Sequence, residues 1–228
     1  MSNHYRNHSY SKLSIPAWIQ AEAQVRADKL PVYQNSHRGK AANQIGCLGE
    51  VISEHWFSMR DVTFAPIHIT KHDYKIDNRL SLEVKTKDRT VLPKIDFDCS
   101  LPLYNHDHQQ ADLYLFISLI RDRDDNSNRI ERFTDAFILG SIFLSEIDAI
   151  GIPFLEGEKD WRNGTKFWTS CLNVEMGQLI SVEETLNIFK GHASECSRAA
   201  VPNPHTVQEM QKRINAGQYK DRKLPQCS

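Results

Sequence analysis

The sequence predicts a mixed α/β domain, in which helices cover the faces of a central mixed sheet. Three observations support this class. Residues 41–59 repeat apolar side chains at helical spacing, residues 73–86 alternate polar and apolar side chains like a β-hairpin, and residues 111–120 form a nearly continuous apolar run of strand length. Such a run is typical of a central strand that is covered on both faces.

Length and composition are those of an ordinary globular domain. The chain has 228 residues, of which 40% are hydrophobic and 25% are charged. No apolar run approaches the ~18–20 residues of a transmembrane helix, and the N-terminal residues lack the apolar stretch of a secretory signal. The five cysteines are scattered and odd in number, which favours reduced thiols. We therefore expect a cytoplasmic protein without a membrane partner.

The net charge of −1 is unevenly distributed along the chain. Residues 1–40 carry six Lys or Arg against two Asp or Glu, and residues 192–228 carry six against three, so residues 41–191 are acidic. An acidic centre with basic flanks suits a metal site that meets a polyanion at its edges, although solvated termini give the same pattern. These bounds predict an N-terminal helical extension, a central domain and a basic C-terminal tail.

Two helices are predicted first. Ser14 and Pro16 begin a helical segment that Pro31 ends. The second helix spans roughly residues 41–59, and one stripe of it collects the residues Ile45, Leu48, Ile52, His55, Trp56 and Met59.

Strands dominate the next part of the chain. Residues 62–70 are rich in β-forming residues, although Pro66 interrupts them. Residues 73–76 and 80–86 then alternate polar and apolar side chains around a turn-prone Asp-Asn-Arg sequence.

Strands and helices alternate in the second half. We expect strands at 111–120, 134–140 and 166–172, and helices at about 141–150 and 181–189. Ser181 is the expected cap of the last helix, with Glu184 three residues on. From about residue 192 the apolar periodicity is lost, which predicts an appended tail.

The predicted hairpin brings carboxylates together. If residues 77–79 form its loop, Asp73 lies opposite Glu83, and alternation puts Lys85 on the same face. Two facing carboxylates repel unless a cation joins them, and Mg²⁺ prefers oxygen ligands, to which the backbone carbonyl of Val84 could add. A lysine beside such a cation can orient water or stabilise negative charge. The alternative is a solvated face on which Lys75 and the neighbouring lysine neutralise the carboxylates.

The pattern Asp73…Glu83-Val84-Lys85 resembles the signature of the PD-(D/E)xK nuclease superfamily, which has a restriction-endonuclease-like core. In many members a helix before the hairpin carries a glutamate in a Gly-x-x-Gly-Glu-like context, and Glu50 has this context here. Residues 113–120 and the strand–helix unit at 133–150 resemble the rest of that core, so the likeness covers roughly residues 41–150, with an extension to 190 left open. One departure is His72, which stands where the eponymous proline would be, a position that varies within the superfamily.

The resemblance implies a metal-dependent nuclease that hydrolyses phosphodiester bonds. Asp73 and Glu83 would hold Mg²⁺, for which Mn²⁺ can substitute, and Lys85 would act on the attacking water. Glu50 would complete the site directly or through water, with Glu54 as its fallback. A helical wheel places Glu50 nearly opposite the apolar stripe, so a solvent-facing residue is the alternative. DNA is the expected partner because most of the superfamily cuts DNA; RNA, endo- or exonuclease action and a homodimer stay open.

Several polar residues outside the hairpin are weaker candidates for nucleic-acid contacts. Lys87 shares the face of Lys85 and could contact a phosphate, or it could be a solvated strand end. Gln109 or Gln110 could contact phosphate or water, or simply belong to a hydrogen-bonded loop. Aromatic and basic residues at 161–168 could stack on bases or pack in a hairpin, and the basic pairs of the tail could contact phosphates or be solvated.

Two other functions remain open from the sequence. One is a catalytically inactive nucleic-acid- or protein-binding module on the same scaffold. The other is a zinc-dependent hydrolase built around His106 and His108, with His72 as a further ligand, although two histidines at that spacing are a weak signal.

Overall fold

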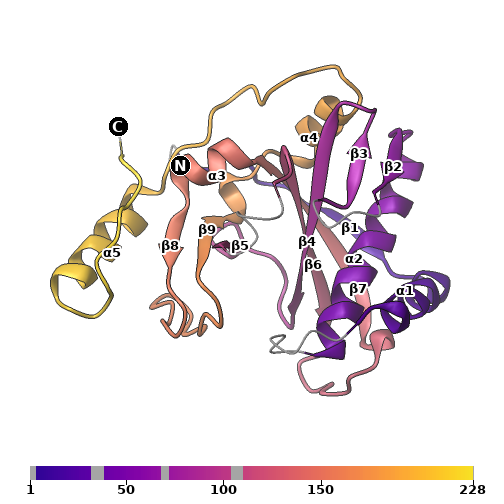
Figure 1. Cartoon of the computed structure of the whole chain (residues 1–228), viewed down its shortest axis with the longest axis horizontal. Helices are drawn as coiled ribbons and strands as arrows, with labels where there is room; N and C mark the ends of the chain where they lie inside the picture. Colours follow the sequence, from indigo (N-terminus) through magenta and orange to yellow (C-terminus); the bar gives the residue numbers. More distant parts are fainter. Residues whose placement is uncertain (1–3, 32–38, 68–71, 104–109, 228) are drawn as a thin grey trace.

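The computed structural model describes residues 4–31, 39–67, 72–103 and 110–227, which form a six-stranded mixed sheet and a smaller three-stranded sheet with five helices around them (Figure 1). The larger sheet has the spatial order β1 (Ser11–Ser14), β7 (Phe133–Phe143), β6 (Leu113–Arg121), β4 (Leu80–Arg89), β3 (Tyr74–Ile76) and β2 (Phe64–Pro66). The smaller sheet has the order β5 (Asp98–Pro102), β9 (Cys171–Glu175) and β8 (Ile152–Phe154). The helices are α1 (Ala17–Lys29), α2 (Lys40–Met59), α3 (Leu144–Ile150), α4 (Val182–Phe189) and α5 (Pro204–Asn215), and two 3₁₀ turns span Ile130–Arg132 and Met176–Gln178.

The larger sheet is mixed because its central strands β4 and β6 run parallel, whereas its other neighbours are antiparallel. Both faces of these central strands are covered. Helices α1, α2 and α4 pack on one face, and α3 with the smaller sheet packs on the other, an arrangement that Figure 1 shows from the side. The predicted fold class, a mixed sheet flanked by helices, is therefore confirmed, as is the doubly covered central strand.

Helix α2 lies unusually close to β4. A Cβ atom added at Gly49 would stand 1.8 Å from Oγ1 and 2.8 Å from Cβ of Thr86, whereas one added at Gly46 would meet no atom within 4 Å. Only a glycine allows this approach, since Thr86 is β-branched and its Cβ is fixed to the strand backbone. This contact fixes the distance between α2 and β4. It therefore also helps to fix the position of Glu50, which follows Gly49 in α2.

Replacing Gly49 with alanine is expected to lower the free energy of unfolding by about 1–3 kcal/mol, because α2 must move away from β4. The matched change Gly46→Ala should be neutral or stabilising by up to about 1 kcal/mol, since alanine is the better helix former and the site is open. Urea denaturation of both variants checks this. Equal stability of the two variants would show that α2 does not approach β4 this closely.

Other predicted elements agree with the structure in place and type. Helix α2 and the hairpin strands lie where expected, and α4 begins after Ser181, whose Oγ accepts a hydrogen bond of 3.2 Å from the backbone N–H of Glu184. Within the part of the chain that the structure describes, no helix has the length and apolarity needed to cross a membrane.

Several expectations about elements were wrong. The strand expected at 166–172 instead begins at Cys171, and the β-rich stretch 62–70 yields only β2, with residues 68–70 outside the described part. Ser14 does not cap α1 but ends β1, an edge strand that makes the N-terminal segment part of the larger sheet. The segment expected to be an appended tail contains a helix that the sequence analysis missed, α5, which buries Met210.

Candidate functional site

The observed register of the hairpin is the one predicted from the sequence as far as Tyr74. Paired Cα partners are Ile76 with Leu80, then Lys75 with Ser81, then Tyr74 with Leu82. The pairing ends there, one residue short of the candidate aspartate.

Asp73 does not continue the ladder opposite Glu83 as expected. Its backbone N–H bonds to the carbonyl of Leu82 at 3.0 Å, and its carboxylate oxygen Oδ2 accepts the backbone N–H of Val84 at 2.7 Å. A side-chain oxygen thus takes the place of a backbone carbonyl, which ends the β3–β4 pairing and fixes the carboxylate at the edge of β4.

Glu83 is buried, with 5% of its surface exposed, so its side of the hairpin is not solvated, but the ion pair with a lysine that the alternative expected is present. Its Oε1 accepts a hydrogen bond of 2.7 Å from Nζ of Lys85, whose side chain is 18% exposed. Its Oε2 is also buried and has no hydrogen-bond partner among the described residues. A buried carboxylate oxygen without a donor is costly, so this atom indicates a position for a cation or a water.

Glu50 is half-buried on α2, and its charge acts on Asp73. Burial raises the pKa of Glu50 to about 7, an effect that Arg26 opposes and that Glu54 and Glu83 reinforce. Burial also raises the pKa of Asp73, with Glu83 and Glu50 adding to the rise. Three acidic side chains from α2, from the residue before β3 and from β4 therefore interact through their charges, and a shared metal site stays a prediction.

Glu54, the fallback for Glu50, is held by other groups. The guanidinium of Arg26 on α1 binds both of its carboxylate oxygens, at 2.7 and 2.8 Å. The hydroxyl of Tyr74 lies 3.0 Å from Oε1 of Glu54 and 3.2 Å from the carbonyl of Glu50. Arg26 and Tyr74 therefore tie α1 and β3 to the turn of α2 that carries Glu50, and neither role was predicted, because both depend on how α1 packs on α2.

The two glutamates of α2 are expected to respond differently to the same substitution. Glu50→Gln should weaken metal-dependent turnover by about tenfold while leaving the melting temperature unchanged or higher, since it removes a poorly solvated carboxylate. Glu54→Gln should lower the melting temperature, because it breaks a bidentate, partly buried ion pair. Thermal melts and rate measurements on both variants check this; a larger rate loss for Glu54→Gln would reverse the assignment.

The other candidate residues that the structure describes are Val84, Lys87 and Gln110. The backbone N–H of Val84 is used by Asp73, and a ligand role for its carbonyl stays a prediction. Lys87 lies on the same face of β4 as Lys85, as expected. Burial lowers the pKa of Lys87, and the charges of Arg89 and Asp98 act on it. Lys87 therefore lies toward the smaller sheet and is not a solvated strand end. Gln110 is exposed at the start of the segment before β6.

Two candidates fall outside the described residues. Gln109 is one of them, and the His106/His108 pair of the zinc alternative is the other. His72 is described and half-buried, and its charge acts on Asp112.

The donor set of the site suits a hard divalent cation. Asp73, Glu83 and Glu50 offer carboxylate oxygens, which Mg²⁺ and Mn²⁺ prefer, and Oε2 of Glu83 has no competing donor among the described residues. In that part of the chain, no three His, Cys, Asp or Glu side chains already converge on one point. Cation binding would therefore require these side chains to reorient.

No family model matches the sequence, and no curated protein matches it. The function is therefore inferred from the geometry of the site.

Proposed function

We propose that the chain is a metal-dependent nuclease that hydrolyses phosphodiester bonds, with DNA as its preferred substrate. The observation that carries the proposal is the buried Oε2 of Glu83, which has no hydrogen-bond partner in the part of the chain that the structure describes. The carboxylate lies beside Lys85 and within the electrostatic influence of Asp73 and Glu50. Buried carboxylates without enough hydrogen-bond donors are typical of a cation site.

The roles of the residues follow from their positions. Asp73 and Glu83 would hold Mg²⁺ or Mn²⁺, with Glu50 completing the ligand set directly or through water. When bound, the cation supplies Lewis-acid stabilisation of the negative charge that develops on the phosphate. Lys85 donates a hydrogen bond to Glu83 in the resting site, and its ammonium can orient the attacking water or stabilise the phosphate oxygens.

The order of elements around the site supports the proposal. Helix α2 is followed by three antiparallel strands, β2 to β4, and then by β6, which runs parallel to β4. This order is similar to the restriction-endonuclease-like core that the sequence motif implies. A difference is that β5, part of the smaller sheet, occupies the connection between β4 and β6.

The test is cleavage of a panel of linear, circular, single-stranded and branched DNA together with RNA. Each substrate is incubated with Mg²⁺, with Mn²⁺ or with EDTA, and the Lys85→Ala variant is run in parallel to reveal a contaminating nuclease. We expect cutting of DNA that requires the metal and is lost in the variant.

Cutting that persists in EDTA, or that is equal in wild type and variant, would refute the proposal. If the protein binds a member of the panel without cutting any of them, the inactive binding module becomes the better description. Preferential cutting of RNA would keep the chemistry and change the substrate.

A further inference from the structure

A groove of about 630 Å³ lies on the side of the smaller sheet, away from the carboxylate site on α2 and β4. One wall is the segment 156–159 that follows β8, and the other is the end of α5 with the residues after it, 213–220. Its volume is within the range of ligand sites.

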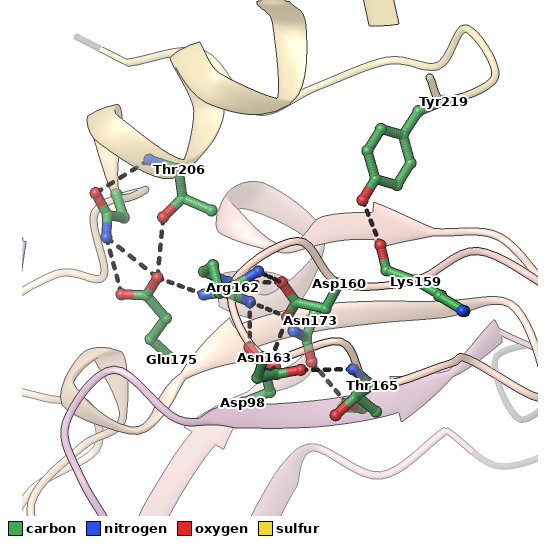
Figure 2. A network of polar contacts seen from close by, with 12 residues as sticks. Asp98, Lys159, Asp160, Arg162, Asn163, Thr165, Asn173, Glu175, Thr206 and Tyr219 are labelled. Carbon is green, nitrogen blue, oxygen red and sulfur yellow. Dashed lines mark hydrogen bonds and ion pairs between the residues drawn. The ribbon is translucent and has the colours of Figure 1, made fainter. Parts of the chain in front are cut away.

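A buried polar network fixes α5 as one wall of this groove (Figure 2). Glu175 at the end of β9 accepts hydrogen bonds from Oγ1 of Thr206 at 3.0 Å and from Nδ2 of Asn203 at 2.9 Å. Arg162 binds Glu175 at 2.8 Å and Asp160 at 2.8 Å, and it also binds Asp98. The first turn of α5 is thus held by side chains that are themselves buried.

The far end of α5 and the residues after it are fixed as well. Tyr219 packs against the ring of Trp161 at 5.8 Å, and its hydroxyl donates to the backbone carbonyl of Lys159, which Figure 2 also shows. Arg222 binds both carboxylate oxygens of Glu158 in an ion pair whose side chains are 5% and 11% exposed. The two walls are therefore bonded to one another, so the groove exists before any ligand arrives.

Near the groove, most of the carboxylates are buried or paired with arginine. Asp98, Asp160 and Glu175 are buried around Arg162, and Glu158 at the groove is neutralised by Arg222. The three carboxylates around Arg162 therefore do not line the groove, and Glu158, which does line it, is paired.

The groove itself presents cations. Lys159 and Lys220 are exposed in its walls, whereas the half-buried guanidinium of Arg213 is paired with Glu209 at 2.8 Å. Glu156 is the exposed carboxylate among the lining residues, which leaves the groove with a net positive charge.

We propose that this groove binds the phosphate backbone of nucleic acid, as a second contact separate from the carboxylate site; the inference rests on the proposed nuclease function for its choice of ligand. Lys159 and Lys220, one from each wall, hold phosphate oxygens, and such contacts position a polynucleotide without reading its sequence. The preformed shape is what distinguishes these cations from those of a solvated tail.

The test measures binding without cleavage, by fluorescence anisotropy of a labelled DNA duplex in EDTA. The double variant Lys159→Gln/Lys220→Gln should weaken binding by about tenfold and make the plot of log affinity against log salt shallower by about two units, one for each lost phosphate contact. The control Lys29→Gln/Lys190→Gln removes the same charge from two exposed lysines, one on α1 and one at the end of α4. It should leave both quantities unchanged.

Equal effects of the two double variants would overturn the groove assignment, as would absence of DNA binding in EDTA. Competition by polyglutamate as effective as by unlabelled DNA would show that the groove prefers acidic polypeptide, and would overturn it too. The proposed nuclease function fails separately, through absence of metal-dependent cleavage by the wild type, so the two failures are distinguishable.

Discussion

Cleavage by the Lys85→Ala variant is expected to fall by about 10²–10⁴-fold relative to the wild type, the range for removal of a charged group that acts in the transition state. Nζ of Lys85 lies 2.7 Å from Oε1 of Glu83, so it is the cation nearest to the carboxylate whose other oxygen lacks a donor among the described residues. Single-turnover rates at saturating Mg²⁺ measure the effect on the chemical step.

Alanine at this position also leaves Glu83 buried without a partner, which destabilises the fold by about 3–5 kcal/mol. The variant Lys85→Gln separates the two effects, because its amide can still donate to Glu83 but carries no charge. We expect Lys85→Gln to melt close to the wild type and to cleave as poorly as Lys85→Ala.

A lysine on the same hairpin provides the control. Lys75 lies on β3, paired with Ser81, and its charge acts on Asp112. Lys75→Gln should cleave at the wild-type rate. If Lys75→Gln lost activity as fully as Lys85→Gln, the loss would reflect the general charge of the hairpin and not the position of one ammonium.

The parts of the site that the sequence predicted are local. Asp73, Glu83 and Lys85 lie within thirteen residues of one another, and the alternation of a strand decides which side chains share a face. The irregularity at Asp73 is less predictable, because its side chain replaces a backbone carbonyl and thereby ends the pairing one residue early.

The parts that were missed depend on packing between distant segments. Arg26 reaches Glu54 across 28 residues of sequence, and no periodicity in α1 marks it as different from other exposed cations. Edge strand β1 was missed because its four residues alternate half-buried and exposed and contain a single apolar side chain, Leu13. Such a segment forms a strand only because β7 offers it an edge.

The C-terminal helix is a different case, since the sequence did contain a start signal. Asn203 caps α5 by accepting the backbone N–H groups of His205 and Thr206, and Pro204 occupies the first turn. The neighbouring prolines and the weak apolar pattern favoured a tail. What fixes α5 is the buried carboxylate of Glu175, which comes from a strand that the sequence placed several residues too early.

Replacing Asp73 with asparagine is expected to uncouple stability from activity. The amide oxygen can still accept the N–H of Val84, so the local backbone should be kept. Burial, Glu83 and Glu50 all raise the pKa of Asp73, which means that its ionised form is unfavourable in the folded protein. Without metal, the variant should therefore be more stable than the wild type, by about 1–3 kcal/mol.

Added Mg²⁺ should reverse this order. A cation that binds only the folded wild type stabilises it by about 2.7 kcal/mol when its concentration is 100 times the dissociation constant. Asp73→Asn should show little of this stabilisation, and its cleavage should fall by at least about 10²-fold. Thermal melts with EDTA and with Mg²⁺, together with cleavage rates, provide the three readouts. The control Asp77→Asn, at an exposed carboxylate in the hairpin turn, should keep both the stabilisation by Mg²⁺ and the activity.

The combination of readouts separates a metal site from a merely strained acidic cluster. Repulsion among the carboxylates alone predicts that Asp73→Asn is more stable in EDTA and that Mg²⁺ shifts neither protein. A metal site predicts the same gain in EDTA together with a shift by Mg²⁺ that only the wild type shows. If the variant is less stable in EDTA, the ionised carboxylate is the better acceptor for the N–H of Val84, and the proposed repulsion among the carboxylates is refuted. The stability measurement needs no substrate, so it tests the metal site even if the nucleic acid that the protein cuts is still to be found.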